Sequence, residues 1–141
     1  MSEENKDLAQ RSWELVNQHS FDALAEVYAA DALIHEPDRD LQSLEEAKHY
    51  IGTYFDAFPD LRFTVDDILG EGDLVATRWT LRGTHEGEME ELGPPTGRRV
   101  ELEGITVHRI EGGKIVEEWE CYDNLGFLQQ LGLIPAEAST G

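Results

Sequence analysis

Asp123 is the residue of this sequence best placed for acid–base chemistry. It follows a run of alternating residues, 115–122, that predicts the last strand of a sheet. Because side chains along a strand alternate between its two faces, Asp123 shares a face with Trp119 and Cys121. Partial desolvation on a buried face makes a carboxylate bind a proton more tightly, which suits a general base. The pattern predicts Asp123 at the edge of an interior pocket.

The same residue has a structural interpretation. Asp123 and Asn124 precede the last predicted helix, 125–131, and both residue types commonly cap the free N–H groups at the start of a helix. Asn124 could serve as the cap instead, which would leave Asp123 free for chemistry. The sequence leaves both roles open.

Histidines and aromatic residues are candidates for the rest of such a site. In the strand predicted over 100–110, alternation turns His108 inward, whereas a bulge at Gly104 would turn it outward. His35 and His85 lie at strand ends, where a histidine is more often a hydrogen-bonded structural residue than a ligand contact. The residues expected to contact a substrate are Tyr54, Phe58, Trp79, His85 and Trp119.

The residue types give no support for a metal or nucleotide site. Cys121 is the only cysteine, no two histidines lie four residues apart, and no glycine-rich loop leads from a strand into a helix. We therefore expect neither a metal nor another cofactor.

The charge excludes several partners. The 141 residues include 30 acidic and 11 basic side chains, for a formal net charge of -19. Such a field repels phosphate backbones and anionic lipid surfaces, so we expect neither nucleic acid nor a membrane as partner. The polar N-terminus lacks the pattern of a signal peptide, and we expect a cytoplasmic protein. Few lysines on an acidic surface fit a high-salt host and an ordinary acidic protein equally well.

Hydrophobic spacing predicts helices in the first half of the chain. One covers 8–16, a short second one begins after Ser20, and a third begins at Ser43, where Glu46 completes a capping box. Pro59 ends the third helix.

From residue 61 the hydrophobic period changes to two, which predicts strands. In the strand that contains Trp79, alternation turns the indole inward and both Arg78 and Arg82 outward. The expected strands are 32–36, 61–65, 74–84, 100–110 and 115–122, and a glycine- and proline-rich loop covers 86–99.

Helices followed by long consecutive strands predict an α+β fold. We expect a cone-shaped, curved, mostly antiparallel sheet, with about three N-terminal helices enclosing an apolar cavity and a short C-terminal helix. The whole chain, 1–141, forms one domain, with flexible ends at about 1–5 and 135–141. Ile105 and Val107 place apolar side chains on the outer sheet face, as expected if that face meets another subunit.

Several motifs together resemble the SnoaL-like polyketide cyclases, also called ester cyclases, of the nuclear transport factor 2-like superfamily. They cover nearly the whole chain in order. The matching segments are Arg78–Thr80, Gly83–Glu88, Pro95–Arg98, Gly104–Ile110 and Gly113–Trp119, followed by Asp123, Gln130, Leu131 and Gly132.

This resemblance implies a lyase or isomerase that closes a polyketide ring by intramolecular aldol condensation without a cofactor. It implies that Asp123 is the general base, and that His108 or His35 steadies the enolate or protonates the new alkoxide. Trp79 and Trp119 would exclude water around an apolar or polyketide-like ligand. The family's usual assembly implies a homodimer or tetramer through the outer sheet face.

Two other functions remain open at this point. The first is a non-catalytic ligand-binding protein of the same fold, in which Asp123 is only a helix cap. The second is a hydrolase resembling epoxide hydrolases, which need two carboxylates and an arginine together in the cavity. The outward direction predicted for Arg78 and Arg82 disfavours the hydrolase.

Overall fold

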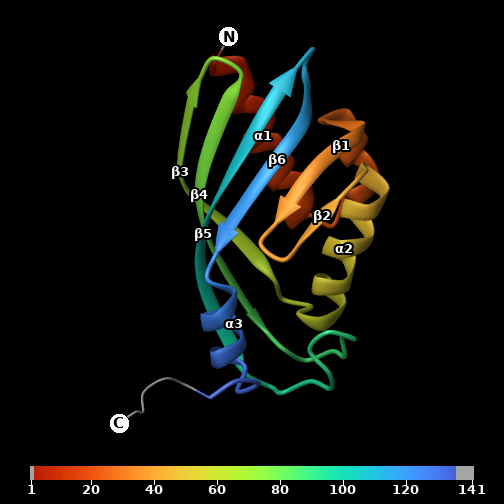
Figure 1. Cartoon of the computed structure of the whole chain (residues 1–141), viewed down its shortest axis with the longest axis vertical. Coiled ribbons are helices and arrows are strands. Elements are labelled where there is room, and N and C mark those ends of the chain that lie inside the picture. The colour runs from red at the N-terminus through yellow and green to blue at the C-terminus, as the bar shows by residue number, and fades with distance from the viewer. Residues whose placement is uncertain (1, 136–141) are drawn as a thin grey trace.

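The fold consists of a curved six-stranded sheet with helices on one face, as a computed structural model of residues 2–135 shows (Figure 1). The N-terminal elements are α1 (Ser2–Asn17), the 3-10 helix η1 (Phe21–Glu26), β1 (Tyr28–Glu36), β2 (Arg39–Leu41) and α2 (Leu44–Ala57). After them come β3 (Arg62–Glu71), β4 (Leu74–Thr84), β5 (Arg99–Glu111), β6 (Lys114–Tyr122) and α3 (Asn124–Gln130). The α+β class, the curved sheet and the short last helix confirm the sequence prediction.

The strands lie in the order β2-β1-β6-β5-β4-β3. Every pairing is antiparallel except that of β1 with β6, which is parallel. The sheet therefore places the N-terminal strand β1 beside the C-terminal strand β6. The sequence prediction missed β2, a three-residue strand that pairs with the end of β1.

Capping residues fix the start of α2. The Ser43 hydroxyl accepts the Glu46 backbone N–H at 3.2 Å, as the capping box predicts. The Glu46 carboxylate in turn accepts the backbone N–H of Gln42 at 2.8 Å. Ser20, in contrast, makes no side-chain cap bond to η1. At the N-terminus, Ser2–Asn5 belong to the first turns of α1, while residue 1 and residues 136–141 lie outside the described part of the chain.

The inward faces of β4 and β5 follow the predicted alternation. Trp79 is 3% exposed and His108 is 1% exposed, while Arg78 and Arg82 lie on the outer face. The β4–β5 ladder runs through Gly104 without a shift in register, so no bulge inverts the phase of His108. The inward direction of His108 is confirmed.

The predicted face of β6 is wrong from Glu117 onward. Arg109 lies opposite Glu117 and Ile110 opposite Ile115, so Val116 is an extra residue in the β5–β6 ladder. A bulge of this kind shifts the phase of a strand by one residue. Consequently Glu118, Glu120 and Tyr122 face the interior. Trp119, at 38% exposure, and Cys121, also exposed, face outward.

Close packing of β5 against an aromatic ring explains Gly104. A β-carbon added to Gly104 would lie 2.3 Å from Cζ2 of Trp79, the residue opposite it in β4. The Trp79 ring therefore lies over the one position of β5 that lacks a side chain. Trp79 also donates its Nε1–H to the Thr106 hydroxyl at 2.9 Å, which holds the indole in this position.

We expect Gly104→Ala to destabilise the protein by about 1–3 kcal/mol, because the indole must leave its hydrogen-bonded position. Gly52→Ala is the matched control: Gly52 lies inside α2 with no atom within 4 Å of its would-be β-carbon. Helix propensity predicts that the control stabilises the protein by about 0.5–1 kcal/mol. Urea unfolding of both variants measures the difference, and equal stabilities would contradict this role of Gly104.

Candidate functional site

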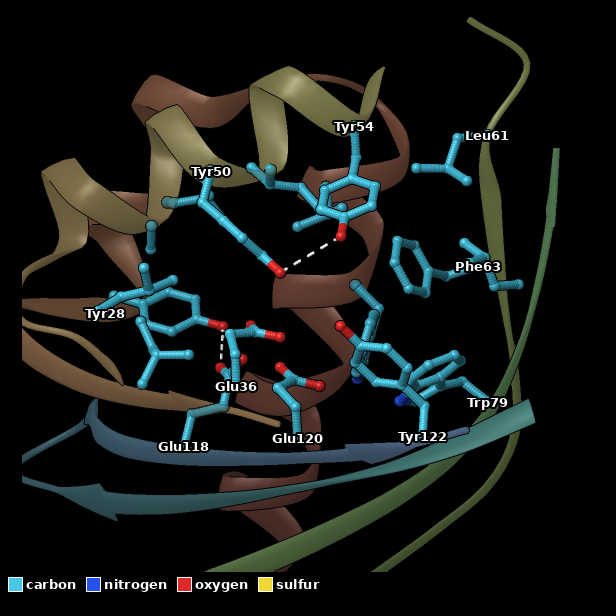
Figure 2. Close-up of a pocket in the computed structure, with 18 of the residues that line it drawn as sticks. Tyr28, Glu36, Tyr50, Tyr54, Leu61, Phe63, Trp79, Glu118, Glu120 and Tyr122 are labelled. Atoms are coloured by element: carbon cyan, nitrogen blue, oxygen red, sulfur yellow. Dashed lines mark hydrogen bonds between the residues drawn. The ribbon is translucent and has the colours of Figure 1, made fainter. Parts of the chain in front are cut away.

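An interior cavity lies between the inner face of the sheet and the helices α1 and α2 (Figure 2). Its volume is about 130 Å³, close to the ~150 Å³ of an engineered protein cavity that binds benzene. The interior as it stands therefore holds a group of about one aromatic ring. The aromatic and acidic side chains that line it are Trp13, Tyr28, Glu36, Tyr50, Tyr54, Phe63, Trp79, Glu118, Glu120, Tyr122 and Phe127.

Three carboxyl groups form one wall of this cavity. Glu36 comes from the end of β1, and Glu118 and Glu120 come from the adjacent parallel strand β6. Figure 2 shows all three side chains side by side, directed from the strands toward Tyr50 on α2. The bulge at Val116 is what turns the two β6 carboxyls to this side of the sheet.

A hydrogen-bond network holds the two β6 carboxyls. Tyr28 donates its phenolic O–H to Glu118, and Nε2 of His108 lies 2.9 Å from the same carboxylate oxygen, Oε1. The Thr106 hydroxyl, which accepts the Trp79 indole N–H, donates to Oε1 of Glu120 at 2.6 Å. Both carboxyl groups are thereby fixed in position, and among the described residues neither pairs with a lysine or arginine.

Burial raises the pKa of all three carboxyl groups. Glu120 shows a pKa well above its ordinary value because of desolvation and the nearby charge of Glu118. Desolvation also raises the pKa of Glu118, although the hydrogen bonds from Glu120 and Tyr28 oppose this effect. For Glu36, desolvation and repulsion by Glu120 raise the pKa to about 9. At neutral pH this wall therefore retains protons that a surface carboxylate would have lost.

The groups around the carboxyls are neutral. Burial lowers the pKa of His108 to about 4, so its imidazole carries no charge at neutral pH. Burial likewise raises the pKa of Tyr28, Tyr50 and Tyr122 above the ordinary phenol value. The hydroxyl oxygens of Tyr50 and Tyr54 lie 3.4 Å apart above the carboxyl wall (Figure 2). These phenols are hydrogen-bond donors at neutral pH.

Two of the five residues expected to contact a substrate line the cavity, namely Trp79 and Tyr54. Phe58 is fully buried in the neighbouring core and stacks on His85 at 5.1 Å between ring centroids. The His85 imidazole lies 3.1 Å from the Thr96 hydroxyl and accepts the Thr96 backbone N–H at 3.2 Å. It thus ties the 86–99 loop to the end of β4.

The remaining predicted residues lie outside the cavity lining. Asp123 is exposed, and its carboxylate accepts the backbone N–H of Gly126 at 2.9 Å, which makes it the N-cap of α3. His35 and Trp119 stack on each other at 5.5 Å between ring centroids. The imidazole of His35 also lies 2.7 Å from a carboxylate oxygen of Glu117. The catalytic roles expected for Asp123 and His35, and the substrate contact expected for Trp119, stay predictions.

Glu36, Glu118 and Glu120 were absent from the residues that the sequence analysis selected. Two carboxylates in the middle of a strand are typical of a solvent-facing side, so the sequence alone favours water on that side of β6. One signal in the sequence does favour an inward direction for Glu118 and Glu120. Both alternate in phase with Tyr122, whose aromatic ring is suited to the interior. Glu36 likewise continues the alternation of the buried residues Ala32 and Ile34.

The structure leaves Arg78 and Arg82 outside the cavity. Arg78 pairs with Asp67 at 2.7 Å and Arg82 with Glu101 at 3.2 Å, both on the outer face of the sheet. Within residues 2–135, no cluster of three or more His, Cys, Asp or Glu side chains could hold a metal ion. No helix in the same range is long and apolar enough to span a membrane.

Comparison with known proteins identifies relatives of the whole chain. The sequence model of SnoaL-like polyketide cyclases matches residues 6–131. No protein with a curated description matches the chain.

Among solved structures, IdmH, a candidate polyketide cyclase from Streptomyces antibioticus, is 36% identical, with a TM-score of 0.80 over 91% of this chain and 98% of its own. AclR, a candidate hydroxylase from Streptomyces galilaeus, is 29% identical, with a TM-score of 0.84 over 99% of this chain and 87% of its own. A candidate SnoaL-like polyketide cyclase from Jannaschia sp. CCS1 is 20% identical, with a TM-score of 0.87 over 96% of each chain. The architecture is the cone-shaped fold of the nuclear transport factor 2-like superfamily.

The cap at α3 predicts how Asp123 contributes to stability. We expect Asp123→Ala to lower the free energy of unfolding by about 0.5–2 kcal/mol, because the Gly126 N–H loses its acceptor. Asp123→Asn should retain most of the stability, since an amide oxygen can accept the same hydrogen bond. Thermal or urea unfolding measures both, and an unchanged Asp123→Ala variant would show that the cap contributes nothing.

The raised pKa of Glu36 predicts that the protein loses stability as the pH rises. The pKa of Glu36 is about 9 in the folded protein, against an ordinary 4.5, so between these values the folded chain holds a proton that the unfolded chain has lost. Stability therefore falls as the pH rises through this window. We expect Glu36→Gln to be more stable than the parent by roughly 1–2 kcal/mol at pH 8, and to lose less stability between pH 6 and pH 8. A smaller slope should remain, because Glu118 and Glu120 act in the same direction.

Urea unfolding at several pH values measures this effect. Glu71→Gln is the matched control, since it removes one exposed carboxylate at the β3–β4 turn and makes the same change in net charge. We expect it to stay within about 0.5 kcal/mol of the parent at each pH. Parallel pH profiles for Glu36→Gln and the parent would refute the assignment of this titration to Glu36.

Proposed function

The chain belongs to the SnoaL-like polyketide cyclase family, and we propose that it closes a carbon ring by intramolecular aldol chemistry with Glu118 and Glu120 as its acid–base pair. Membership of the family indicates a cyclase or isomerase role. The observation that carries the finer proposal is the hydrogen-bonded carboxyl pair on the wall of the cavity. Two carboxyls this close titrate as a unit and share a proton over a wide pH range.

A shared proton gives the pair one acidic and one basic member. Glu118 accepts hydrogen bonds from Tyr28 and Glu120, which favour its ionised form. Glu120 has the more strongly raised pKa of the two. Its carboxyl oxygen Oε1 also accepts a hydrogen bond from the Thr106 hydroxyl. Transfer of the shared proton to Glu118 frees Glu120 as a carboxylate of raised basicity in the cavity. A carbon-bound proton next to a carbonyl requires a base of this kind.

The proposed reaction balances within one substrate. The Glu120 carboxylate takes a proton from carbon α to one carbonyl, and the electron pair left on that carbon attacks a second carbonyl of the same molecule. A carbon–carbon bond forms while the attacked carbonyl π bond breaks. Its oxygen then takes a proton from the carboxyl pair and becomes a hydroxyl group, which restores the pair. The step consumes no electrons from outside the substrate.

The rest of the cavity supports this chemistry by positioning. Trp79 and Tyr54 present flat apolar surfaces on which a chain can fold, and a folded chain brings its reacting carbons together. His108 holds Glu118 through Nε2 and is neutral, so it is a positioning residue in this scheme. The neutral Glu36 carboxyl can donate a hydrogen bond to the carbonyl that becomes the enolate.

The sequence-based alternative assigns the base to Asp123, with His35 or His108 assisting. The 2.9 Å bond to Gly126 and the exposed position of Asp123 support the cap instead. The same observation supports the second candidate function, a non-catalytic ligand-binding protein in which Asp123 is purely structural. Assembly through the outer sheet face, where Ile105 and Trp119 are exposed, also remains a proposal.

Paired variants separate these functions. We expect Glu120→Gln to reduce turnover about 10²-fold or more, because a general base contributes this much. Asp123→Asn should keep turnover close to that of the parent. The probe is heptane-2,6-dione, a small diketone whose intramolecular aldol reaction gives a six-membered ring. NMR in D₂O follows deuterium uptake at its α carbons and the appearance of the cyclised product.

Each outcome of this assay has one meaning. Loss of turnover in Asp123→Asn with full activity in Glu120→Gln would return the role of base to Asp123. A parent protein that binds the diketone without accelerating exchange above buffer would favour the non-catalytic function. Unfolding midpoints of both variants establish that either loss is chemical and not structural.

A further inference from the structure

The acidic side chains of the cavity have no basic counterpart among the described lining residues. Glu36, Glu118 and Glu120 supply its carboxyl groups, and the lining includes no lysine, arginine or histidine. A charge of opposite sign acts on Glu36 from Arg39, whose guanidinium lies 5.2 Å from the centre of the Tyr50 ring. Its charge is already matched, since Arg39 pairs with Asp38 at 3.2 Å and also with Glu91. Residues 2–135 thus supply no free cation to this wall.

Aromatic faces surround the same wall. Tyr28 lies over one end of it and Tyr122 over the other, while Tyr50 and Tyr54 form a T-shaped pair above it, with ring centroids 5.2 Å apart (Figure 2). The faces of such rings attract cations, and the attraction is strongest where water is excluded. Carboxyl groups together with several tyrosine rings form an environment suited to an ammonium group.

The remainder of the cavity is apolar, apart from one donor. Leu61 and Phe63 lie at the end away from the carboxyls (Figure 2), and Leu81 also lines the cavity, so a ligand must carry an apolar body as well as a head group. Trp13 also lines the cavity, is 7% exposed, and has a buried Nε1–H without a partner among the described residues. An oxygen acceptor on a ligand that reaches Nε1 would satisfy this N–H.

We propose that the cavity is a site for an amine: a ligand with an apolar ring or chain whose protonated nitrogen lies among Glu36, Glu118, Glu120 and the tyrosine rings. This inference rests on the cavity being the site of the proposed function, and it adds the charge class of the substrate. It also predicts that free carboxylic acids are rejected, since a second anion at this wall would meet only carboxyls and phenols.

A cation among the carboxyls changes their protonation. Glu36 has a pKa of about 9, so it is largely protonated at pH 7.5. The charge of an ammonium group favours the ionised form of each carboxyl around it. Binding of an amine should therefore release protons to the solvent, whereas binding of an uncharged analogue should not. Proton release distinguishes an amine held at this wall from one that merely partitions into an apolar cavity.

Three probes of nearly equal size test the proposal, namely benzylamine, benzyl alcohol and benzoate. Isothermal titration calorimetry at pH 7.5, in two buffers with different ionisation enthalpies, measures affinity and the number of protons exchanged. We expect benzylamine to bind at least about tenfold more tightly than benzyl alcohol, with proton release, as expected for a desolvated cation–π site. Benzoate should bind more weakly than either. Equal or tighter binding of benzoate, or amine binding without proton release, would overturn the proposal.

Matched variants place the effect at the carboxyl wall. Glu36→Gln should reduce the preference for amine over alcohol at least about threefold and lower the number of protons released, as expected when one carboxyl leaves a cation site. Glu71→Gln removes a surface carboxylate and the same unit of charge, and it should leave both quantities unchanged. An equal loss in the two variants would mean that the long-range field of an acidic protein, and not this wall, selects the amine.

These measurements do not depend on catalysis. Amine-selective binding by a protein that fails to cyclise heptane-2,6-dione would uphold the amine site and refute the cyclase chemistry. Turnover that requires Glu120, without any preference for benzylamine over benzoate, would do the reverse. Failure of either proposal is therefore recognisable on its own.

Discussion

The extra residue at Val116 determines which side chains the last strand presents to the interior. Before the bulge, Ile115 points into the core; after it, Glu118, Glu120 and Tyr122 take the inward positions that strict alternation would have given to their neighbours. A shift of one residue reverses every side chain that follows. The inward direction of Glu118 and Glu120 and the exposure of Trp119 both follow from this irregularity.

Burial of three carboxyl groups has a physical cost that the fold meets in two ways. An isolated carboxylate in an apolar interior is strongly disfavoured, so the groups retain protons. Hydrogen bonds then satisfy those on β6: Tyr28 and His108 contact Glu118, and Thr106 contacts Glu120. A protein under selection for stability alone would favour apolar residues at these positions. Carboxyl groups with raised pKa values that line a cavity are a pattern common at functional sites.

The family and the position of the site rest on different kinds of observation. The match over residues 6–131 and the structural similarity to IdmH establish the family and the cone-shaped fold. The same fold hosts many reactions, so the reaction must be argued from the groups that share the cavity. Here those groups are carboxyls and phenols, with Trp79 held against Gly104 by the Thr106 hydroxyl. Asp123, which the family resemblance favoured as the base, completes the start of α3.

The sequence by itself determined the local elements and the faces of the regular strands. Apolar spacing predicted α2 with its Ser43 cap, and strict alternation predicted the inward positions of Trp79 and His108, because β4 and β5 pair without a slip through that region. Only the tertiary structure decided the face of β6. A bulge depends on how two strands pair, and neither strand encodes that pairing alone.

The same distinction applies to the site. The residue types at Glu36, Glu118 and Glu120 indicate acid–base chemistry only once β1 and β6 are known to be adjacent, which is a long-range parallel pairing of the two ends of the chain. Asp123 could be read from the sequence as a cap or as a base; the structure shows the cap bond to the Gly126 N–H, and the role of base stays a prediction. Local patterns reveal what a segment can form, whereas contacts between distant segments decide which of its side chains meet.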